Sequence, residues 1–398
     1  MYYFIGSLFP ISLSKEIYKH STGNIDNAAN SLQWSYIEGF KQNDCRLEIV
    51  TLPGVGTFPK NYSKAALPKS VFNVAPAISG NSLSFITLPL LGLVSRYYSL
   101  SKFLNKENRV SDKDVIIVYS LKSAFLLACC GLKKKLKDIH ICVIVPDLPQ
   151  YMSESGNMVY RFLKKIDKKI IDRCLKKADS FVLLSDAMND ALNVGIRPWV
   201  RIEGISANYS DNILCMKHPG FVYCYTGTLD KRYGILNLLH SFMQLEGDDL
   251  MLWICGKGNA EESVIECSEK DSRIKYLGIL SHDEVLKKQK EAKVLVNPRT
   301  GAGEYTKYSF PSKTMEYMAS GTPCIMYDLP ALPEEYKPHL FLIGDDQETS
   351  LVDKMRDVYN IPKVELEKFG EEARMFIQRE KNPKRQVSLL LSMINNKL

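Results

Sequence analysis

The stretch 297–326 combines residue types that bind a phosphorylated ligand. An apolar segment runs into a polar, Gly-containing loop, and a short helix is predicted to follow. Ser309 or Ser312 caps that helix, with Pro311 near its first turn. The unpaired N–H groups and the positive dipole end of such a helix favour an anion, and Lys313 lies in the first turn. The pattern predicts an anion-binding site.

A single acid, Glu316, follows one turn later. A carboxylate beside an anion site suits hydroxyl recognition, as on a ribose. The helix begins after a predicted strand, and open α/β sheets bind ligands at the carboxyl ends of their strands. The stretch therefore indicates a site for a nucleotide diphosphate.

Composition places the chain among globular proteins. It has 398 residues, of which 45% are hydrophobic and 24% charged, so two domains with their own cores are expected. Ten scattered cysteines without metal-ligand spacing are interpreted as reduced thiols of a cytoplasmic protein, and no metal site is expected. Residues 1–10 lack the features of a signal peptide and are expected to form the first core strand. The apolar run Leu83–Val94 is too short to span a bilayer.

Strand-like runs alternate with helical stretches along the whole chain. Strands are predicted at Tyr2–Leu8, Arg46–Leu52, Val115–Ser120, His140–Val145, Ser180–Leu184, Trp199–Glu203, Val222–Thr226, Met251–Cys255, Ile274–Tyr276, Val294–Asn297 and Cys324–Tyr327. Helices are predicted at Asn27–Gln42, Leu121–Lys135, Asn157–Ala178, Ile235–Gln244, Ala260–Lys270, His282–Ala292, Pro311–Ser320, Glu365–Arg379 and Lys384–Asn395. This alternation is typical of βαβ units and parallel sheets.

Two such series predict an α/β protein with two Rossmann-like, doubly wound domains facing across a cleft. We expect an N-terminal domain over 1–205, a linker over 206–220 and a C-terminal domain over 221–375. Residues 376–398 either pack on the second domain or cross back to the first; periodicity does not decide between these.

Three motifs resemble those of glycosyltransferase family 4, the group 1 glycosyl transferases. They are T-G-T-L at Thr226–Leu229, I-C-G-K-G at Ile254–Gly258 and E-Y-M-A-S-G-T-P-C-I at Glu316–Ile325. The resemblance is clearest from Phe221 to Gly344. It implies the GT-B fold and a retaining, metal-independent enzyme that takes a nucleotide sugar as substrate and needs no cofactor.

The resemblance assigns Glu316 to the donor ribose, as the second acid of the family's E-x7-E motif. Tyr308 stands where the first Glu contacts the donor sugar, which marks a variant; Glu304 or a backbone N–H is expected to substitute. Tyr308 and Ser312 are included among the donor-binding residues. A solvated helix glutamate is the simpler interpretation of Glu316 taken alone.

Cations are expected at the diphosphate. Lys313 and Arg299 would neutralise the charge that develops on the departing nucleotide. The family places an Arg and a Lys after the first strand of this domain, where the chain has Thr228 and Tyr233, so Lys231 or Arg232 is expected to take over. For each of these cations the alternative is a surface charge.

Glycines allow close approach of the backbone to a ligand at the same edge. Gly227, Gly256 and Gly258 are candidates, although a plain tight turn explains the last two equally well. A dinucleotide fingerprint after the first strand and a phosphate-binding P-loop are both absent from the sequence, which disfavours NAD binding.

On the acceptor side, Asp147 follows the strand His140–Val145 and is a candidate base for the acceptor hydroxyl, or else a capping residue. Gly23 and Asn24 match the family's glycine-bearing loop after the first strand.

A basic helix is predicted at Asn157–Ala178. Its apolar stripe, which consists of Val159, Phe162, Leu163, Ile166, Ile170 and Cys174, is expected to face the core. The many Lys and Arg residues on its other faces are interpreted either as solvated or as attracted to an anionic membrane surface. Nucleic-acid binding lacks a supporting motif.

We therefore expect a glycosyltransferase on the inner face of the cell membrane. It would move a sugar from a nucleotide sugar to a saccharide acceptor, plausibly lipid-linked, in surface polysaccharide biosynthesis. Two alternatives stay open: a nucleotide-sugar 2-epimerase of the same fold, and a non-catalytic partner protein that binds a sugar nucleotide.

Overall fold

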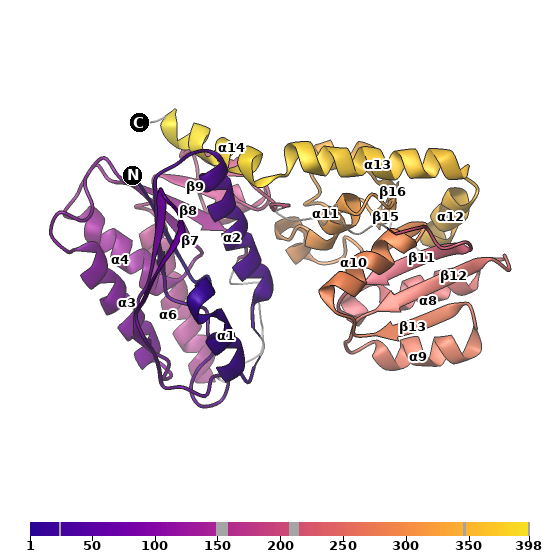
Figure 1. Ribbon diagram of the computed structural model, residues 1–398, viewed down its shortest axis with the longest axis horizontal. Helices are drawn as coiled ribbons and strands as arrows, with labels where there is room; N and C mark the ends of the chain where they lie inside the picture. The colour runs from indigo at the N-terminus through magenta and orange to yellow at the C-terminus, as the bar shows by residue number, and fades with distance from the viewer. Residues whose placement is uncertain (24, 149–157, 207–214, 345–347, 397–398) are drawn as a thin grey trace. The chain divides into compact units, whose positions relative to one another are not determined.

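The computed structural model describes residues 1–23, 25–148, 158–206, 215–344 and 348–396. The chain divides into two compact units, each described here by itself (Figure 1). Unit 1 comprises Met1–Ile205 and Pro383–Leu398, and unit 2 comprises Ser206–Asn382.

Unit 1 is built on an eight-stranded sheet with the order β10-β9-β8-β7-β1-β2-β5-β4, parallel except for the edge strand β4. Its elements are β1 (Tyr2–Gly6), α1 (Ile11–His20), α2 (Asn27–Gln42), β2 (Leu47–Thr51), β3 (Ala66–Leu67), β4 (Ser70–Ala75), β5 (Ile78–Ser82), β6 (Phe85–Ile86), α3 (Leu91–Leu104), β7 (Val115–Tyr119), α4 (Ser123–Lys133), β8 (His140–Val145), α6 (Met158–Leu175), β9 (Ser180–Leu183), α7 (Met188–Ala191), β10 (Trp199–Arg201) and α14 (Pro383–Asn395). The central strands are buried on both faces, which explains their continuous apolar sequences.

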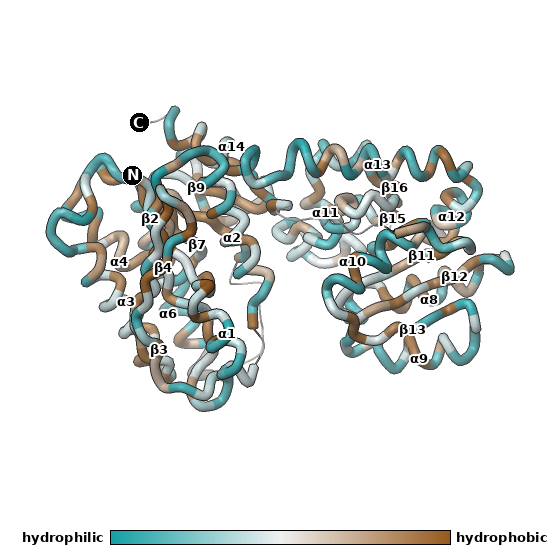
Figure 2. The backbone as a smooth tube through the Cα atoms, in the orientation of Figure 1, coloured by the Kyte–Doolittle hydropathy of each residue, from teal (hydrophilic) through white to brown (hydrophobic). Residues whose placement is uncertain are grey.

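Unit 2 is built on a six-stranded parallel sheet with the order β13-β12-β11-β14-β15-β16. Its elements are β11 (Phe221–Thr226), the 3₁₀ helix η1 (Lys231–Tyr233), α8 (Ile235–Met243), β12 (Leu250–Cys255), α9 (Glu261–Lys270), β13 (Ile274–Gly278), α10 (His282–Glu291), β14 (Val294–Asn297), η2 (Glu304–Tyr308), α11 (Ser312–Ala319), β15 (Cys324–Tyr327), η3 (Glu334–His339), β16 (Phe341–Ile343), α12 (Glu348–Tyr359) and α13 (Lys363–Glu380). The backbone of α13 alternates between hydrophilic and hydrophobic residues (Figure 2), as in an amphipathic helix with one buried face. The predicted α/β class with two doubly wound, Rossmann-like units is confirmed.

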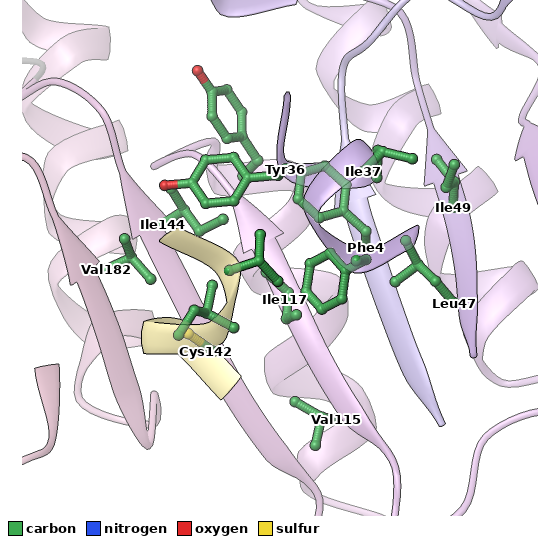
Figure 3. Packing of buried hydrophobic residues seen from close by; sticks show 14 of the residues in the cluster. Phe4, Tyr36, Ile37, Leu47, Ile49, Val115, Ile117, Cys142, Ile144 and Val182 are labelled. Atoms are coloured by element: carbon green, nitrogen blue, oxygen red, sulfur yellow. The ribbon is translucent and has the colours of Figure 1, made fainter. Parts of the chain in front are cut away.

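The core of unit 1 joins the two ends of the chain. Phe4 and Ile117 pack with Tyr36 of α2 between the sheet and the helices (Figure 3). The last helix, α14, contacts α2, β9 and β10, and it adds Val387 and Leu390 to the same cluster. The C-terminal helix is therefore part of unit 1.

Helices α3, α4 and α6 lie on the other face of this sheet. Each connects one parallel strand to the next, and α4 contacts both α3 and α6. Because right-handed crossovers that run in the same direction along a sheet place their helices on one face, the three helices form a single layer. They share an orientation, with their N-termini at the carboxyl ends of the strands.

The predicted core-facing stripe of α6 is wrong over part of its length. Cys174 is buried as expected, but Phe162 is 62% exposed, and Leu163 and Ile166 are also exposed. The side chain of Val159 lies outside the described residues. The N-terminal half of α6 therefore presents apolar side chains to solvent.

The sequence analysis missed the segment between β2 and β7. The apolar run Leu83–Val94 is divided between β6, a loop and the beginning of α3. The short strands β3 to β6 lack a long apolar run that would reveal them, and α3 is only weakly amphipathic. Among the described residues, no helix is both long and apolar enough to span a bilayer.

Candidate functional site

The N-terminus of α11 lies at the carboxyl edge of the unit 2 sheet, after β14. Neither predicted cap is formed, since the N-cap residue is Pro311 and it makes no side-chain hydrogen bond. Ser312 is exposed, and Ser309 instead accepts a hydrogen bond from Arg299 Nη2 at 3.3 Å. Within the described structure, the N–H groups of Ser312 and Lys313 have no partner. They are free to donate to an anion.

Lys313 extends across Gly227, which follows β11. A Cβ atom added at Gly227 would lie 1.2 Å from Lys313 Nζ, and the φ of Gly227 is +148°. The ammonium group is 3.5 Å from the hydroxyl oxygen of Tyr225 and 5.1 Å from the centre of its ring. Burial lowers the pKa of Lys313 to about 8, which the nearby Glu316 carboxylate partly offsets. This lysine is a desolvated cation held over a glycine.

The glycines at this edge let two loops pack against each other. A Cβ atom at Gly256 would lie 1.7 Å from the carbonyl oxygen of Gly227, and one at Gly258 would lie 2.2 Å from that of Leu229. The Gly227 N–H donates to Cys255 at 2.8 Å. Gly256 and Gly258 therefore fix the turn that carries Gly227, and their close approach to a ligand stays a prediction.

Arg299 is a buried cation in the loop after β14. Only 9% of it is exposed, and its guanidinium lies 5.2 Å from the ring of Tyr305 and 5.9 Å from that of Tyr233. Apart from the bond to Ser309, its side chain has no polar partner in the part of the chain that the structure describes, and its Nε is unsatisfied. A buried cation without a counterion favours binding of an anion.

Glu316 lies one turn into α11 and is held by a residue that the sequence analysis missed. The side-chain amide of Gln289 donates to Glu316 Oε1 at 2.5 Å and to Thr226 Oγ1 at 2.9 Å. Gln289 is fully buried on α10, on the same face as Leu286. A glutamine on the apolar face of a helix was the available signal. Gln289 orients the carboxylate that the resemblance assigns to the ribose.

Lys231 and Arg232, the two cations after β11, differ in their ion-pair partners. Arg232 forms an ion pair with Asp230 at 2.7 Å, and hydrogen bonds from Arg232 lower the pKa of Asp230 to about 2. Lys231 is exposed, and its side chain has no described partner, which leaves it the more available of the two. Gly234 packs on the carbonyl of Pro298, which brings this turn next to the loop of Arg299.

The variant position, Tyr308, ends the 3₁₀ helix Glu304–Tyr308 and is half-buried, whereas Glu304 is exposed. That Glu304 or a backbone N–H takes the role of the missing acid stays a prediction.

In unit 1, Asp147 follows β8 at the carboxyl edge of the sheet. Local burial and, second, the carboxylate of Asp26 raise its pKa to about 6, although the residue as a whole stays exposed. Asp26 caps α2 by accepting from the Ala29 N–H at 3.0 Å. Gly23 packs against Asn61, and Asn24 lies outside the described residues.

Two cations at this edge were missed. Lys122 is the N-cap residue of α4, and burial, followed by the charge of Arg96, lowers its pKa to about 8. The Arg96 guanidinium lies 4.0 Å above the Phe85 ring. Neither has an ion-pair partner among the described residues. The position of Lys122, three residues after the end of the strand Val115–Tyr119, was the signal that could have found it.

A basic hollow of about 700 Å³ lies elsewhere in unit 1, at the amino ends of β8 and β9. It is lined by Lys134, Lys176, Lys177 and Arg197 together with the ion pair of Lys133 and Asp179. It contains none of the predicted site residues. In the described ranges, no cluster of His, Cys, Asp and Glu could hold a metal ion.

Comparison with known families gives a match within unit 2. Residues 220–360 match the family described as Glycosyl transferases group 1, which confirms the resemblance noted in the sequence. No curated protein sequence matches significantly.

Solved structures of similar fold extend over the whole chain. Sucrose-phosphate synthase from Thermosynechococcus elongatus is 15% identical with a TM-score of 0.63, and the match covers 100% of both chains. The apo form of the lipopolysaccharide outer core galactosyltransferase WaaB is 17% identical with a TM-score of 0.61, covering 100% of this chain and 99% of that one. HepE of Anabaena, in complex with UDP, is 12% identical with a TM-score of 0.59, covering 98% and 99%. At these identities the likeness shows the shared fold.

Proposed function

We propose that this chain, whose residues 220–360 match the group 1 glycosyl transferases, transfers a sugar from a nucleotide-sugar donor to a saccharide acceptor. The observation that carries the proposal is the anion site at α11. Lys313 over Gly227, the buried Arg299 and the free N–H groups of α11 come from neighbouring loops at one edge of a sheet. Such a site suits the diphosphate of a nucleotide sugar.

In this proposal unit 2 stabilises the leaving group. The bond between the anomeric carbon and the diphosphate oxygen breaks, and Lys313 and Arg299 neutralise the charge that the nucleoside diphosphate acquires. Glu316, oriented by Gln289, accepts a hydrogen bond from the ribose. Lys231, or Arg232 when released from Asp230, contributes a further positive charge.

Unit 1 serves the acceptor. The acceptor hydroxyl forms the new bond to the anomeric carbon and gives up its proton, for which Asp147 is our candidate base. An ionised Asp147 accepts that proton above a pH of about 6. We propose that transfer retains the anomeric configuration and needs neither a metal nor a cofactor.

The finer assignment is a lipid-linked saccharide acceptor in surface polysaccharide biosynthesis, used at the inner face of a membrane. It is supported by the excess of Lys and Arg in the first 205 residues and by the solvent-exposed face of α6.

The test is nucleotide release from a panel of nucleotide sugars, with and without lipid-linked saccharides and in the presence of EDTA. Release that depends on the acceptor and persists in EDTA supports metal-independent transfer, and the anomeric proton coupling of the product reports retention. Epimerised donor without release would instead support a 2-epimerase. Binding with neither outcome would support a non-catalytic partner protein.

A further inference from the structure

A group of large apolar side chains is open to solvent on the layer formed by α3, α4 and α6. Leu91 is 56% exposed, Tyr98 65% and Phe162 62%. The group, called the apolar patch below, consists of Leu90, Leu91, Leu93, Val94 and Tyr98 at α3, Leu127 of α4, and Phe162, Leu163 and Ile166 of α6. Soluble proteins rarely expose so many neighbouring apolar side chains without a partner.

The patch occupies one end of the layer. Leu90 directly precedes α3 and Tyr98 lies at its middle; the other members lie in the N-terminal halves of the three helices, which share one direction, and the central helix α4 contacts both neighbours. All three helices therefore present apolar side chains at the same end, that of the carboxyl edge of the sheet.

On the three helices themselves, the charge near the patch is positive. Neither α3 nor α4 contains an acidic residue, and α6 has none before Asp167. Arg161, Lys165 and Lys169 are exposed on α6, and none of them has a described ion-pair partner. Arg96 and Lys122 add two half-buried cations without carboxylate partners at α3 and α4.

We propose that the apolar patch docks unit 1 on a lipid bilayer that contains anionic lipids. Leucines and aromatic residues bordered by lysines and arginines match the boundary between acyl chains and phosphate-bearing headgroups. The aliphatic stems of Arg161 and Lys165 cover apolar surface while their charges reach the phosphates. The inference deepens the proposed function, on which it rests for the lipid-linked acceptor, because docking holds the carboxyl edge of unit 1 at the membrane.

The test is flotation of the full chain with vesicles of phosphatidylcholine alone or with phosphatidylglycerol, without donor or acceptor. We expect binding to the anionic vesicles that weakens with added salt. The triple variant Leu91→Ser, Val94→Ser, Phe162→Ser should lose at least tenfold in the bound-to-free ratio. The charge variant Arg161→Gln, Lys165→Gln, Lys169→Gln should lose the preference for anionic vesicles.

A matched control replaces exposed apolar residues of unit 2, in the variant Val364→Ser, Met375→Ser, which should bind as the wild type does. Circular dichroism and nucleotide binding verify that each variant is folded. Failure of the wild-type chain to bind anionic vesicles, or full binding by the triple variant, overturns the proposal. Self-association in sedimentation that the triple variant abolishes, without vesicle binding, would make the patch a protein interface.

Failure of this inference is distinguishable from failure of the proposed function. Vesicle binding is measured without turnover, and transfer is measured on a short-chain acceptor in detergent. If the chain transfers sugar but does not bind vesicles, only the docking proposal is wrong. If it binds vesicles but does not transfer sugar, only the proposed enzymatic function is wrong.

Discussion

At the carboxyl edge of the unit 2 sheet, the candidate residues are interlocked. Lys313 extends over Gly227, Gly256 packs on the turn that carries Gly227, and Gln289 holds Glu316. At the carboxyl edge of the unit 1 sheet, Lys122 and Asp147 form no ion pair in the described ranges, and apolar side chains lie exposed near by. The candidate side chains of unit 2 are therefore already held in place by contacts with one another. In the described part of unit 1, Lys122 and Asp147 have no such ion-pair contact.

We propose that this difference corresponds to two kinds of ligand. A nucleoside diphosphate has a fixed geometry, and a site already in place avoids the cost of ordering side chains on binding. The proposed acceptor, a saccharide on a lipid carrier, is instead presented at a membrane surface. Of the four predictions below, the first and the third test whether unit 2 holds the donor and unit 1 serves the acceptor, and the other two test how the loops and helix ends of unit 2 are held in place.

The largest effect is expected for Lys313→Met, which keeps the length of the side chain and removes its charge. Loss of a charge that stabilises the leaving group should lower kcat/KM by about 100- to 1,000-fold. Steady-state nucleotide release measures it. The matched control is Lys270→Gln, at the exposed end of α9, which should keep wild-type turnover; equal losses in both variants would remove Lys313 from the site.

The next effect concerns the stability of unit 2. Gly278→Ala forces alanine into a φ of +67° with open space around it and should cost about 1–3 kcal/mol of the unfolding free energy. Gly256→Ala should cost more, because its Cβ also meets the carbonyl oxygen of Gly227 at 1.7 Å. Urea unfolding of both variants measures the difference. Equal costs would show that the two turns do not depend on close packing.

The pH profile should separate the two edges. Burial lowers the pKa of Lys313 to about 8, so the cation is lost as the pH rises through 8 and nucleotide affinity should fall there. The pKa of Asp147 is raised to about 6, so this base is protonated below 6 and turnover should fall there by up to tenfold per pH unit.

Two variants test whether Asp147 causes the fall in turnover at acidic pH (the acidic limb of the pH profile) and Lys313 the fall in nucleotide affinity at alkaline pH. Asp147→Asn should lower turnover and flatten the acidic limb without changing nucleotide affinity, and Lys313→Met should flatten the alkaline dependence of nucleotide affinity. If the acidic limb persists in Asp147→Asn, the base is a group other than Asp147.

The smallest expected effect is on the unfolding free energy, and it is tested at the N-termini of two helices in unit 2. Ser281 forms a capping box with Glu284 at the start of α10, so Ser281→Ala should cost about 1 kcal/mol. Ser312→Ala should stay within about 0.5 kcal/mol, because Ser312 makes no cap at the start of α11. Urea unfolding measures both. A clear cost for Ser312→Ala would mean that its hydroxyl does cap the helix.

The sequence predicted the strands that are buried on both faces best, and the segment between β2 and β7 of unit 1 worst. Parallel strands that are buried on both faces are continuous apolar runs, so β14 and β15 were predicted with their observed bounds. Glycines and a lysine next to such strands indicated the site. Gln289 was missed because its role depends on contacts with Thr226 and Glu316, which lie far from it in the chain.

Exposure was harder to predict than secondary structure. The bounds of α6 were nearly right, but its periodicity assigned Phe162 and Ile166 to the core. A helical stripe shows which residues share a face, and it does not show whether another element covers that face. Among the described side chains of α6, the buried ones are Ile171, Cys174 and Leu175, all in its C-terminal half.

The most direct test of the account is calorimetric titration of nucleoside diphosphates into the wild-type chain, Lys313→Met and Asp147→Asn. The account predicts that at least one nucleoside diphosphate binds the wild-type chain, that Lys313→Met weakens this binding at least tenfold, and that Asp147→Asn leaves it unchanged. Equal binding by the wild-type chain and Lys313→Met would contradict the assignment of the donor site to unit 2.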